Sequence, residues 1–230
     1  LKNTTKMSIK LIKSNHLSYF VRSIACAFLV FMVAPANASF QLDFGTIFNG
    51  GTPTGPAPWL TATFTDTMTE GQVQLTLTSN LPNSIEYIDQ VGFNSTVTIS
   101  TFVSAPVSSQ VQAISFGSDN QSVSGAGAAG AGFDALINFK SANAERFNLT
   151  ESITFLITGA GLTENSFNST NSSLLFAAAH FAGLPNSSLP SGSASASITA
   201  VPEPSSFVFG IALSALGYIG IRRRRKKTAI

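Results

Sequence analysis

The chain has 230 residues, of which 44% are hydrophobic and only 10% are charged, and its formal net charge is +2. That total hides an acidic middle: residues 39–200 hold two cations, Lys140 and Arg146, against ten carboxylates, a formal charge of −8. Since phosphate binding needs a basic surface, this region is not expected to bind nucleic acid. The single cysteine, Cys26, lies near the N-terminus, so disulfides and thiolate chemistry are excluded from the middle region.

The first predicted element is an export signal over residues 7–38. Positive residues come first, an uncharged apolar core follows over residues 24–33, and a small-residue cleavage site closes the segment, which is the order of a secretory signal peptide. The cleavage site consists of Ala36 and Ala38, with Ser39 as the first residue of the exported chain. We therefore predict a signal helix that uses the Sec machinery and whose removal takes the cysteine with it.

Residues 39–200 have the length of one domain and a composition that favours strands over helices. Apolar and polar residues alternate along several stretches, which is typical of strands with one buried face. The predicted strands are 60–65, 73–78, 96–100, 133–140 and 153–157 and, with a weaker alternation, 86–93, 111–116, 174–181 and 193–199. The pattern predicts an all-β fold, a single β-sandwich that is jelly-roll-like rather than barrel-like.

Three stretches lack this alternation and are predicted to be loops. Residues 49–58 are rich in Gly and Pro and lead into Trp59, and residues 122–132 are a Gly/Ala/Ser tract. Residues 185–197 are rich in Ser, Pro and Gly and are expected to join the last strand to the C-terminal tail.

His180 is the only histidine that follows the export signal. A Ser-His-Asp hydrolase needs a histidine as base and a serine on a strained turn, and no Gly-x-Ser-x-Gly turn is present in the sequence. A zinc site needs several His or Cys ligands, so no metal ligands are assigned. Because His180 lies in an apolar predicted strand, we interpret it as structural and assign no catalytic residue.

The ten carboxylates leave acid–base chemistry open, since glycosidases work with a pair of Asp or Glu residues. Nothing in the sequence pairs two of them, so a secreted carbohydrate-active hydrolase is the alternative function, to be decided by whether two carboxylates converge in one pocket. Asp43 and Asp119 are weak calcium candidates, because we expect both in loops that offer oxygen ligands. No Asp-x-Asp-x-Asp loop is present, and no other cofactor is expected.

Residues 61–69 carry threonine at every second position, which would align five hydroxyls on one face of a strand. Such a row is similar to part of an ice-binding surface, but threonine is also common on strands that face solvent. One row without matching rows on neighbouring strands makes no flat array, so we prefer the solvent-facing interpretation. Trp59 and Phe102 could form a sugar-stacking platform, although a Trp after a proline-rich loop is more often a core residue.

The last predicted element is the C-terminal tail, residues 201–227. It opens on a Pro-Glu-Pro step, which is stiff and excludes helix, and continues as an uncharged apolar run over residues 207–221. The run predicts a single short transmembrane helix, and the cations that follow predict a cytoplasmic stop. The motif residues are Val201, Pro202, Glu203 and Pro204, and the basic stop is Arg222, Arg223, Arg224, Arg225, Lys226 and Lys227.

This order of motif, apolar run and basic stop resembles the PEP-CTERM sorting signal of Gram-negative bacteria, which the membrane protease exosortase recognises. The resemblance implies that residues 39–200 are exported through the inner membrane, anchored there before processing, and then delivered to the cell surface or the extracellular space. We expect a non-catalytic structural or binding protein associated with exopolysaccharide. A permanent inner-membrane anchor is the remaining alternative.

The exported region has a second resemblance. Residues 43–45, 53–62, 143–147 and 161–163 are similar to stretches in a group of uncharacterised PEP-CTERM proteins. That similarity implies a shared fold and leaves the activity open.

Overall fold

The computed structural model describes residues 38–185 and 190–199, and these residues are all-β, as predicted. Among them, no helix is long and apolar enough to cross a membrane. The predicted signal helix and the predicted C-terminal transmembrane helix lie outside the described residues. The strands are β1 Ser39–Gly50, β2 Leu60–Asp66, β3 Gln72–Ser79, β4 Tyr87–Phe93, β5 Thr101–Ser104, β6 Val111–Ser122, β7 Ala131–Phe139, β8 Ser152–Thr158, β9 Ala177–Ala182 and β10 Ser191–Thr199, and the short 3-10 helices are η1 Gly127–Gly130, η2 Asn143–Glu145 and η3 Glu164–Phe167.

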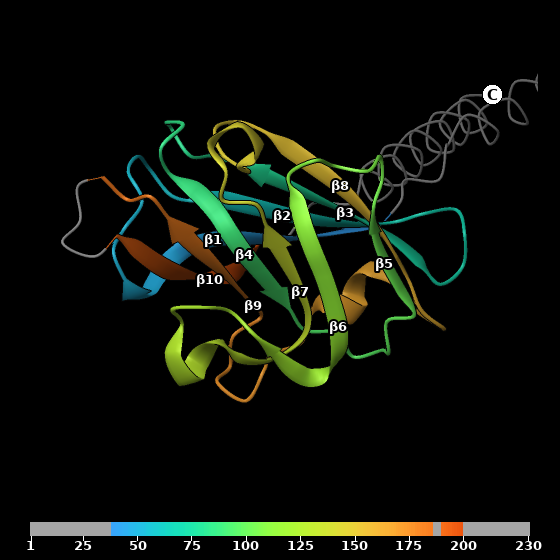
Figure 1. The fold of residues 1–230 in the computed structure, drawn as a ribbon. Helices are drawn as coiled ribbons and strands as arrows, with labels where there is room; N and C mark the ends of the chain where they lie inside the picture. The colour runs from blue at the N-terminus through green and yellow to red at the C-terminus, as the bar shows by residue number, and fades with distance from the viewer. Residues whose placement is uncertain (1–37, 186–189, 200–230) are drawn as a thin grey trace, which may run out of the picture. The chain divides into compact units, whose positions relative to one another are not determined.

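All ten strands form one antiparallel sheet in the order β5-β8-β3-β2-β1-β10-β9-β4-β7-β6 (Figure 1). The sheet folds over on itself, so that the inner faces of its two halves meet across the core. The ring of Phe64 on β2, for example, meets the ring of Phe93 on β4 edge-on, with centroids 5.3 Å apart. The two layers expected of a sandwich are therefore one continuous, nearly barrel-like sheet, because β1 and β10 pair along their length and join the halves.

The best-predicted strands are those with strict alternation. Along β2, β3 and β8 every second residue is buried, and the residues between them face outward. The apolar rows of both halves form one hydrophobic core that includes Phe44, Phe64 and Phe155. Trp59 also belongs to it at 6% exposure, as does Phe102 at 4%, so neither ring offers a surface for sugar stacking.

Two sequence predictions were wrong. Residues 96–100 form no strand; they are an irregular segment in which the Thr96 amide bonds to the Ser166 carbonyl and the Ser100 amide to the Thr158 carbonyl. The stretch 185–197, predicted to be a linker, contains most of β10, a central strand of which the weaker alternation predicted residues 193–199. Its small residues are required there, because a Cβ at Gly192 would collide with the carbonyl oxygen of Gly51.

Candidate functional site

The outer surface of one half of the sheet is covered by residues 123–130, which follow β6 and end with η1 (Figure 1). We call these residues the covering segment. Val123 and Ala126 of this segment pack against outward-facing side chains of β7 and β9. The result is a second, smaller hydrophobic cluster on the outer side of the sheet, made of Val123, Ala126, Phe133, Leu136 and Ala178.

A polar row runs beneath the covering segment across five adjacent strands. Its members are cross-strand partners in the order Asn138 on β7, Gln90 on β4, His180 on β9, Ser193 on β10 and Asn49 on β1. Three of them bond to the backbone of the covering segment. Gln90 Oε1 accepts from the Ser124 amide at 2.6 Å, Ser193 Oγ donates to the Ser124 carbonyl at 3.4 Å, and Asn49 Nδ2 donates to the Gly125 carbonyl.

His180 is the one residue of this row with an acidic partner. Its Nδ1 lies 3.1 Å from Asp89 Oδ2, because the register of β4 and β9 shifts between Ile88 and Gln90 and brings Asp89 toward the histidine. On the other side of the ring, a Cβ built on Gly125 would stand 3.0 Å from Nε2, so the covering segment closes over the imidazole. The His180 residue is only 9% exposed.

Serine, histidine and aspartate are thus neighbours here, but their arrangement is not that of a hydrolase. Ser193 is fully buried, and its hydroxyl donates to a carbonyl oxygen of the covering segment. A nucleophilic serine must instead donate to the histidine and face a substrate. The polar row therefore holds the covering segment in place, which agrees with the structural interpretation of His180. Sequence reasoning missed Asp89, because a shift of register is not visible in the residue pattern.

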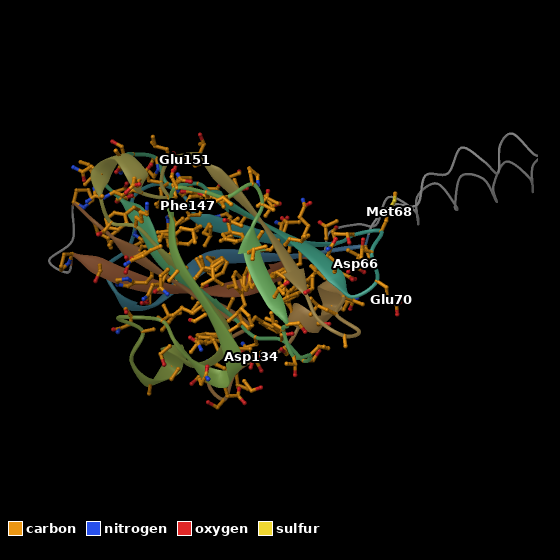
Figure 2. All side chains as sticks on the ribbon, turned by 45° about the vertical axis from the view of Figure 1, so that its right-hand side comes forward. Asp66, Met68, Glu70, Asp134, Phe147 and Glu151 are labelled. Atoms are coloured by element: carbon orange, nitrogen blue, oxygen red, sulfur yellow. The ribbon has the colours of Figure 1, made fainter. Side chains whose placement is uncertain are left out.

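A second carboxylate site lies where β2 ends and η3 begins. The Glu164 amide donates to Asp66 Oδ1 at 2.7 Å, and the Glu164 residue is 5% exposed. Burial, followed by a hydrogen bond and charge repulsion from Asp66, raises the pKa of Glu164 from 4.5 to about 7. Figure 2 shows Asp66 with Glu70 near the turn between β2 and β3. A pocket of about 190 Å³ lies beside the pair and is lined by Asp66, Glu70 and Thr163, among others.

The hydrolase alternative requires two carboxylates in one pocket; this pocket is lined by Asp66 and Glu70 but not by Glu164, so the contact between Asp66 and Glu164 concerns that pair alone. The two carboxyl groups are close enough to share a hydrogen bond. Retaining glycosidases hold their carboxyls about 5 Å apart and inverting ones about 6.5–9.5 Å apart, which leaves room for the sugar or for a water molecule. The contact between Asp66 and Glu164 therefore suits the sharing of one proton.

The two calcium candidates are not brought together. Asp43 lies inside β1 rather than in a loop, and its carboxylate accepts from Gln41 and Thr61. Asp119 lies near the end of β6 with a φ of 51°, and its amide donates to Asp134 Oδ1 at 2.9 Å. Among the described residues, no group of three or more His, Cys, Asp or Glu side chains could hold a metal ion.

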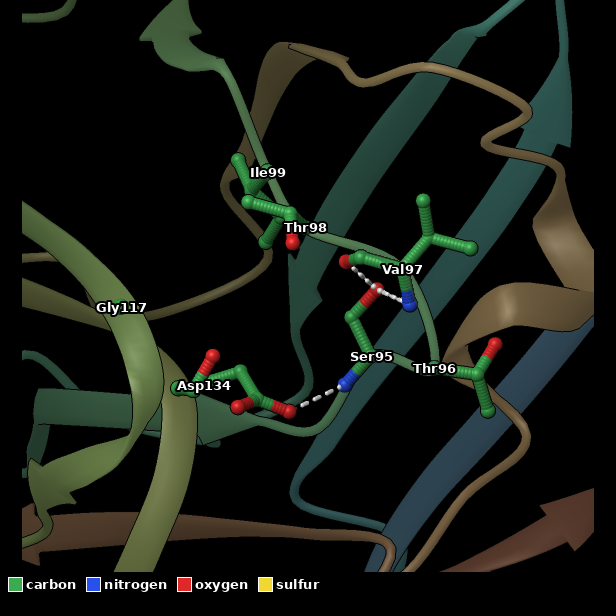
Figure 3. A pocket seen from close by; sticks show the side chains of 8 residues that line it. Ser95, Thr96, Val97, Thr98, Ile99, Gly117 and Asp134 are labelled. Carbon is green, nitrogen blue, oxygen red and sulfur yellow. Dashed lines mark hydrogen bonds between the residues drawn. The ribbon is translucent and has the colours of Figure 1, made fainter.

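Asp134 belongs to a small pocket of about 110 Å³ between the irregular segment 95–99 and the middle of β6. Figure 3 shows its carboxylate accepting from the Ser95 amide, at 2.8 Å. Because the Asp119 amide bonds to the other carboxylate oxygen, both Asp134 oxygens serve to fix backbone segments. The pocket wall otherwise offers hydroxyl groups, those of Thr96, Thr98 and Ser118.

The outer surface of the other half of the sheet carries rows of hydroxyl side chains. Thr63 on β2 is paired with Thr76 on β3, which is paired with Thr154 on β8. The expectation that the threonine row of β2 has no counterpart on neighbouring strands was therefore wrong. We call the hydroxyl residues of this surface the hydroxyl face: Thr61, Thr63 and Thr65 of β2, Thr76 and Thr78 of β3, Ser152, Thr154 and Thr158 of β8, and Thr101 of β5. Gln74 of β3 and Leu156 of β8 lie on the same surface, in register with Thr65.

Comparison with known proteins identifies one segment. Residues 200–225 match the PEP-CTERM protein-sorting motif, as the resemblance of the tail implied. No curated protein and no solved structure matches the chain. The motif marks an exported protein that exosortase sorts and whose tail is anchored in the membrane before processing. The match contains Val201–Pro204 and Arg222–Arg225, which lie outside the described residues, as does Ala36 of the predicted cleavage site.

Proposed function

We propose that the described domain is a non-catalytic structural or binding protein of the cell surface or extracellular matrix, associated with exopolysaccharide. The observation that carries this proposal is the sorting motif at residues 200–225, which marks the chain for export and for exosortase. The formal charge of −8 over residues 39–200 suits a soluble domain that repels polyanions.

The hydrogen bonds that the buried polar groups make support a non-catalytic role. His180 is held between Asp89 and the covering segment, and the buried Glu86 accepts from the amide and the hydroxyl of Thr54, which fixes the loop after β1. No buried side-chain polar atom among the described residues lacks a hydrogen-bond partner. Catalytic groups are usually aimed at a space that a substrate fills, and these groups are bonded to other groups of the protein.

A secreted carbohydrate-active hydrolase is one alternative, and the pocket lined by Asp66 and Glu70 is where it would act. A domain that stays in the inner membrane for good is the other alternative, and it differs only in the fate of the tail. Ser39 begins β1 and pairs with Thr65, so the predicted Sec cleavage after Ala38 leaves the first strand whole.

Mass spectrometry of the protein recovered from host cells tests the proposal. With an active exosortase, we expect a released protein that begins at Ser39 and ends between Pro202 and Ser205, and that co-purifies with the extracellular matrix. Cells without exosortase are the control and should retain the tail. Recovery of full-length protein in the membrane fraction of both strains would support the permanent anchor and overturn the proposal.

A further inference from the structure

The hydroxyl face repeats in two directions, along the strands and across them. Along a strand, residues on one face repeat every about 6.8 Å, and neighbouring strands are about 4.8 Å apart. Thr61 pairs with Thr78 and Thr63 with Thr76, so two adjacent rows cross from β2 to β3 in register. Both rows continue onto β8 without a register shift. These two repeats are close to the spacings of oxygen atoms on a prism face of hexagonal ice.

The middle of this array has free hydroxyl groups. At the margins, the hydroxyls of Thr78 and Ser152 bond to each other at 2.9 Å, and those of Thr101 and Thr158 do so at 2.7 Å. For Thr63, Thr76 and Thr154, no side-chain hydrogen bond is found within the part of the chain that the structure describes. Each of these hydroxyls can donate one hydrogen bond and accept two, and each threonine adds a methyl group beside its hydroxyl.

The main hydrophobic core also supports the inner side of the strands that carry the hydroxyl face. The inward-facing neighbours of the array, among them Phe64, Leu75 and Phe155, are fully buried in the main core. A packed core fixes the spacing of the outer side chains, since protein interiors are close-packed. Ordered water can then be held at several points at once without reorganising the surface.

Charge and aromatic content indicate which ligand this surface suits. None of the nine residues of the hydroxyl face is ionisable, and Asp43 beside it is already bonded to Thr61, so the surface matches an uncharged ligand. A second copy of the domain, at −8, would be repelled. The aromatic rings of these strands, Phe64, Phe102 and Phe155, all lie in the core, so no ring is left for stacking against a sugar.

From these observations we infer that the hydroxyl face binds ice, with the row Thr63, Thr76 and Thr154 at its centre. The inference goes beyond the proposed function: export and sorting hold whether or not this face binds ice. An ice-binding surface of this kind would act outside the cell, where the sorting motif sends the domain.

Inhibition of ice recrystallisation by the full chain in nanodiscs, with empty nanodiscs as blank, tests the inference. We expect wild-type protein to inhibit, and Thr76→Lys to raise the concentration needed at least about tenfold, a loss of about 1.4 kcal/mol. A lysine at this half-buried position can extend into solvent, and a circular dichroism spectrum checks its fold. Gln112→Lys, the same change in charge at an exposed position of β6, should leave inhibition unchanged. Thr154→Lys is the second variant if Thr76→Lys does not fold.

Two results would overturn the inference. One is wild-type protein without inhibition, and the other is equal inhibition by wild-type and by a folded lysine variant of the face. Retention on a neutral polysaccharide that Thr76→Lys abolishes, in the absence of ice activity, would assign the face to a sugar polymer instead. None of these results affects the masses of the processed protein, so failure here is distinguishable from failure of the proposed sorting and release.

Discussion

The two halves of the sheet use their outer surfaces in opposite ways. In the β7-β4-β9-β10 half, polar side chains such as Gln90 and Ser193 are occupied by the covering segment. In the β2-β3-β8 half, the hydroxyls of Thr63, Thr76 and Thr154 meet no protein group among the described residues. Outward-facing polar residues on a strand therefore either bind a covering segment or form an open surface. Only their hydrogen-bond partners in the folded protein distinguish the two cases.

Removal of a buried ring from the covered half should have the largest effect. Phe133 is fully buried in the small outer cluster beneath the covering segment. Phe133→Ala should lower the free energy of unfolding by about 3–5 kcal/mol, because it leaves a cavity that the cluster cannot fill. Urea unfolding of the two proteins measures the difference. A loss below about 1 kcal/mol would mean that the covering segment contributes little to the fold.

A methyl group added beneath the covering segment should have a smaller effect. A Cβ at Gly92 on β4 would stand 2.8 Å from Val123 Cγ2 and 2.9 Å from Phe133 Cδ2. Gly92→Ala should therefore destabilise the protein by about 1–3 kcal/mol through overpacking. Thermal unfolding provides the measurement. Unchanged stability would show that the covering segment can move away at little cost.

Removal of a single hydroxyl should distinguish the two halves of the sheet most clearly. Ser193→Ala removes a buried donor to the covering segment and should cost about 1 kcal/mol. Thr63→Val removes a hydroxyl with no bond among the described residues and should change stability by less than about 0.5 kcal/mol. Both variants need the same denaturant titration. Equal losses would contradict the distinction between an occupied and an open surface.

The carboxylate pair predicts a modest dependence of stability on pH. The pKa of Glu164 is raised to about 7 in the folded protein, so the folded state holds a proton that the unfolded chain releases near 4.5. The stabilisation from this proton is complete below about pH 4.5 and is lost as the pH rises to about 7. Glu164→Gln should remove this dependence and be more stable than wild-type at about pH 8.

Glu70→Gln is the control, since Glu70 is an exposed carboxylate in the same region. It should keep the wild-type dependence on pH. If Glu164→Gln and wild-type lose stability in parallel between about pH 5 and about pH 7, the shared proton is not held at this pair.

Alternation was sufficient to predict β2, β3 and β8, because each has one buried and one exposed face. It predicted only residues 193–199 of β10, and the same stretch also looked like a linker, because close approach of Gly192 to Gly51 requires small residues. The strand β1 was also missed. Its residues Phe40, Leu42 and Phe44 alternate on the buried face, but the sequence analysis expected Asp43 to lie in a loop.

The sites depended on distant partners and could be predicted only in part. Asp66 and Glu164 are 98 residues apart, and no local pattern joins them. The hydroxyl face could be predicted in part, because the alternating threonines of β2 are apparent in the sequence. The register that aligns Thr76 and Thr154 with them is a property of the folded sheet. The sorting motif could be predicted from the sequence, because its residues lie in one contiguous segment.

Amide hydrogen exchange at Ser124 tests most directly the claim that one half is clamped and the other open. The Ser124 amide donates to Gln90 Oε1 at 2.6 Å, so it should exchange slowly even though the Ser124 residue is exposed. Gln90→Ala should speed its exchange by roughly tenfold, the factor that corresponds to about 1.4 kcal/mol, while Thr76→Val should leave it unchanged. Exchange of the wild-type Ser124 amide at the rate of an unfolded chain would contradict the account.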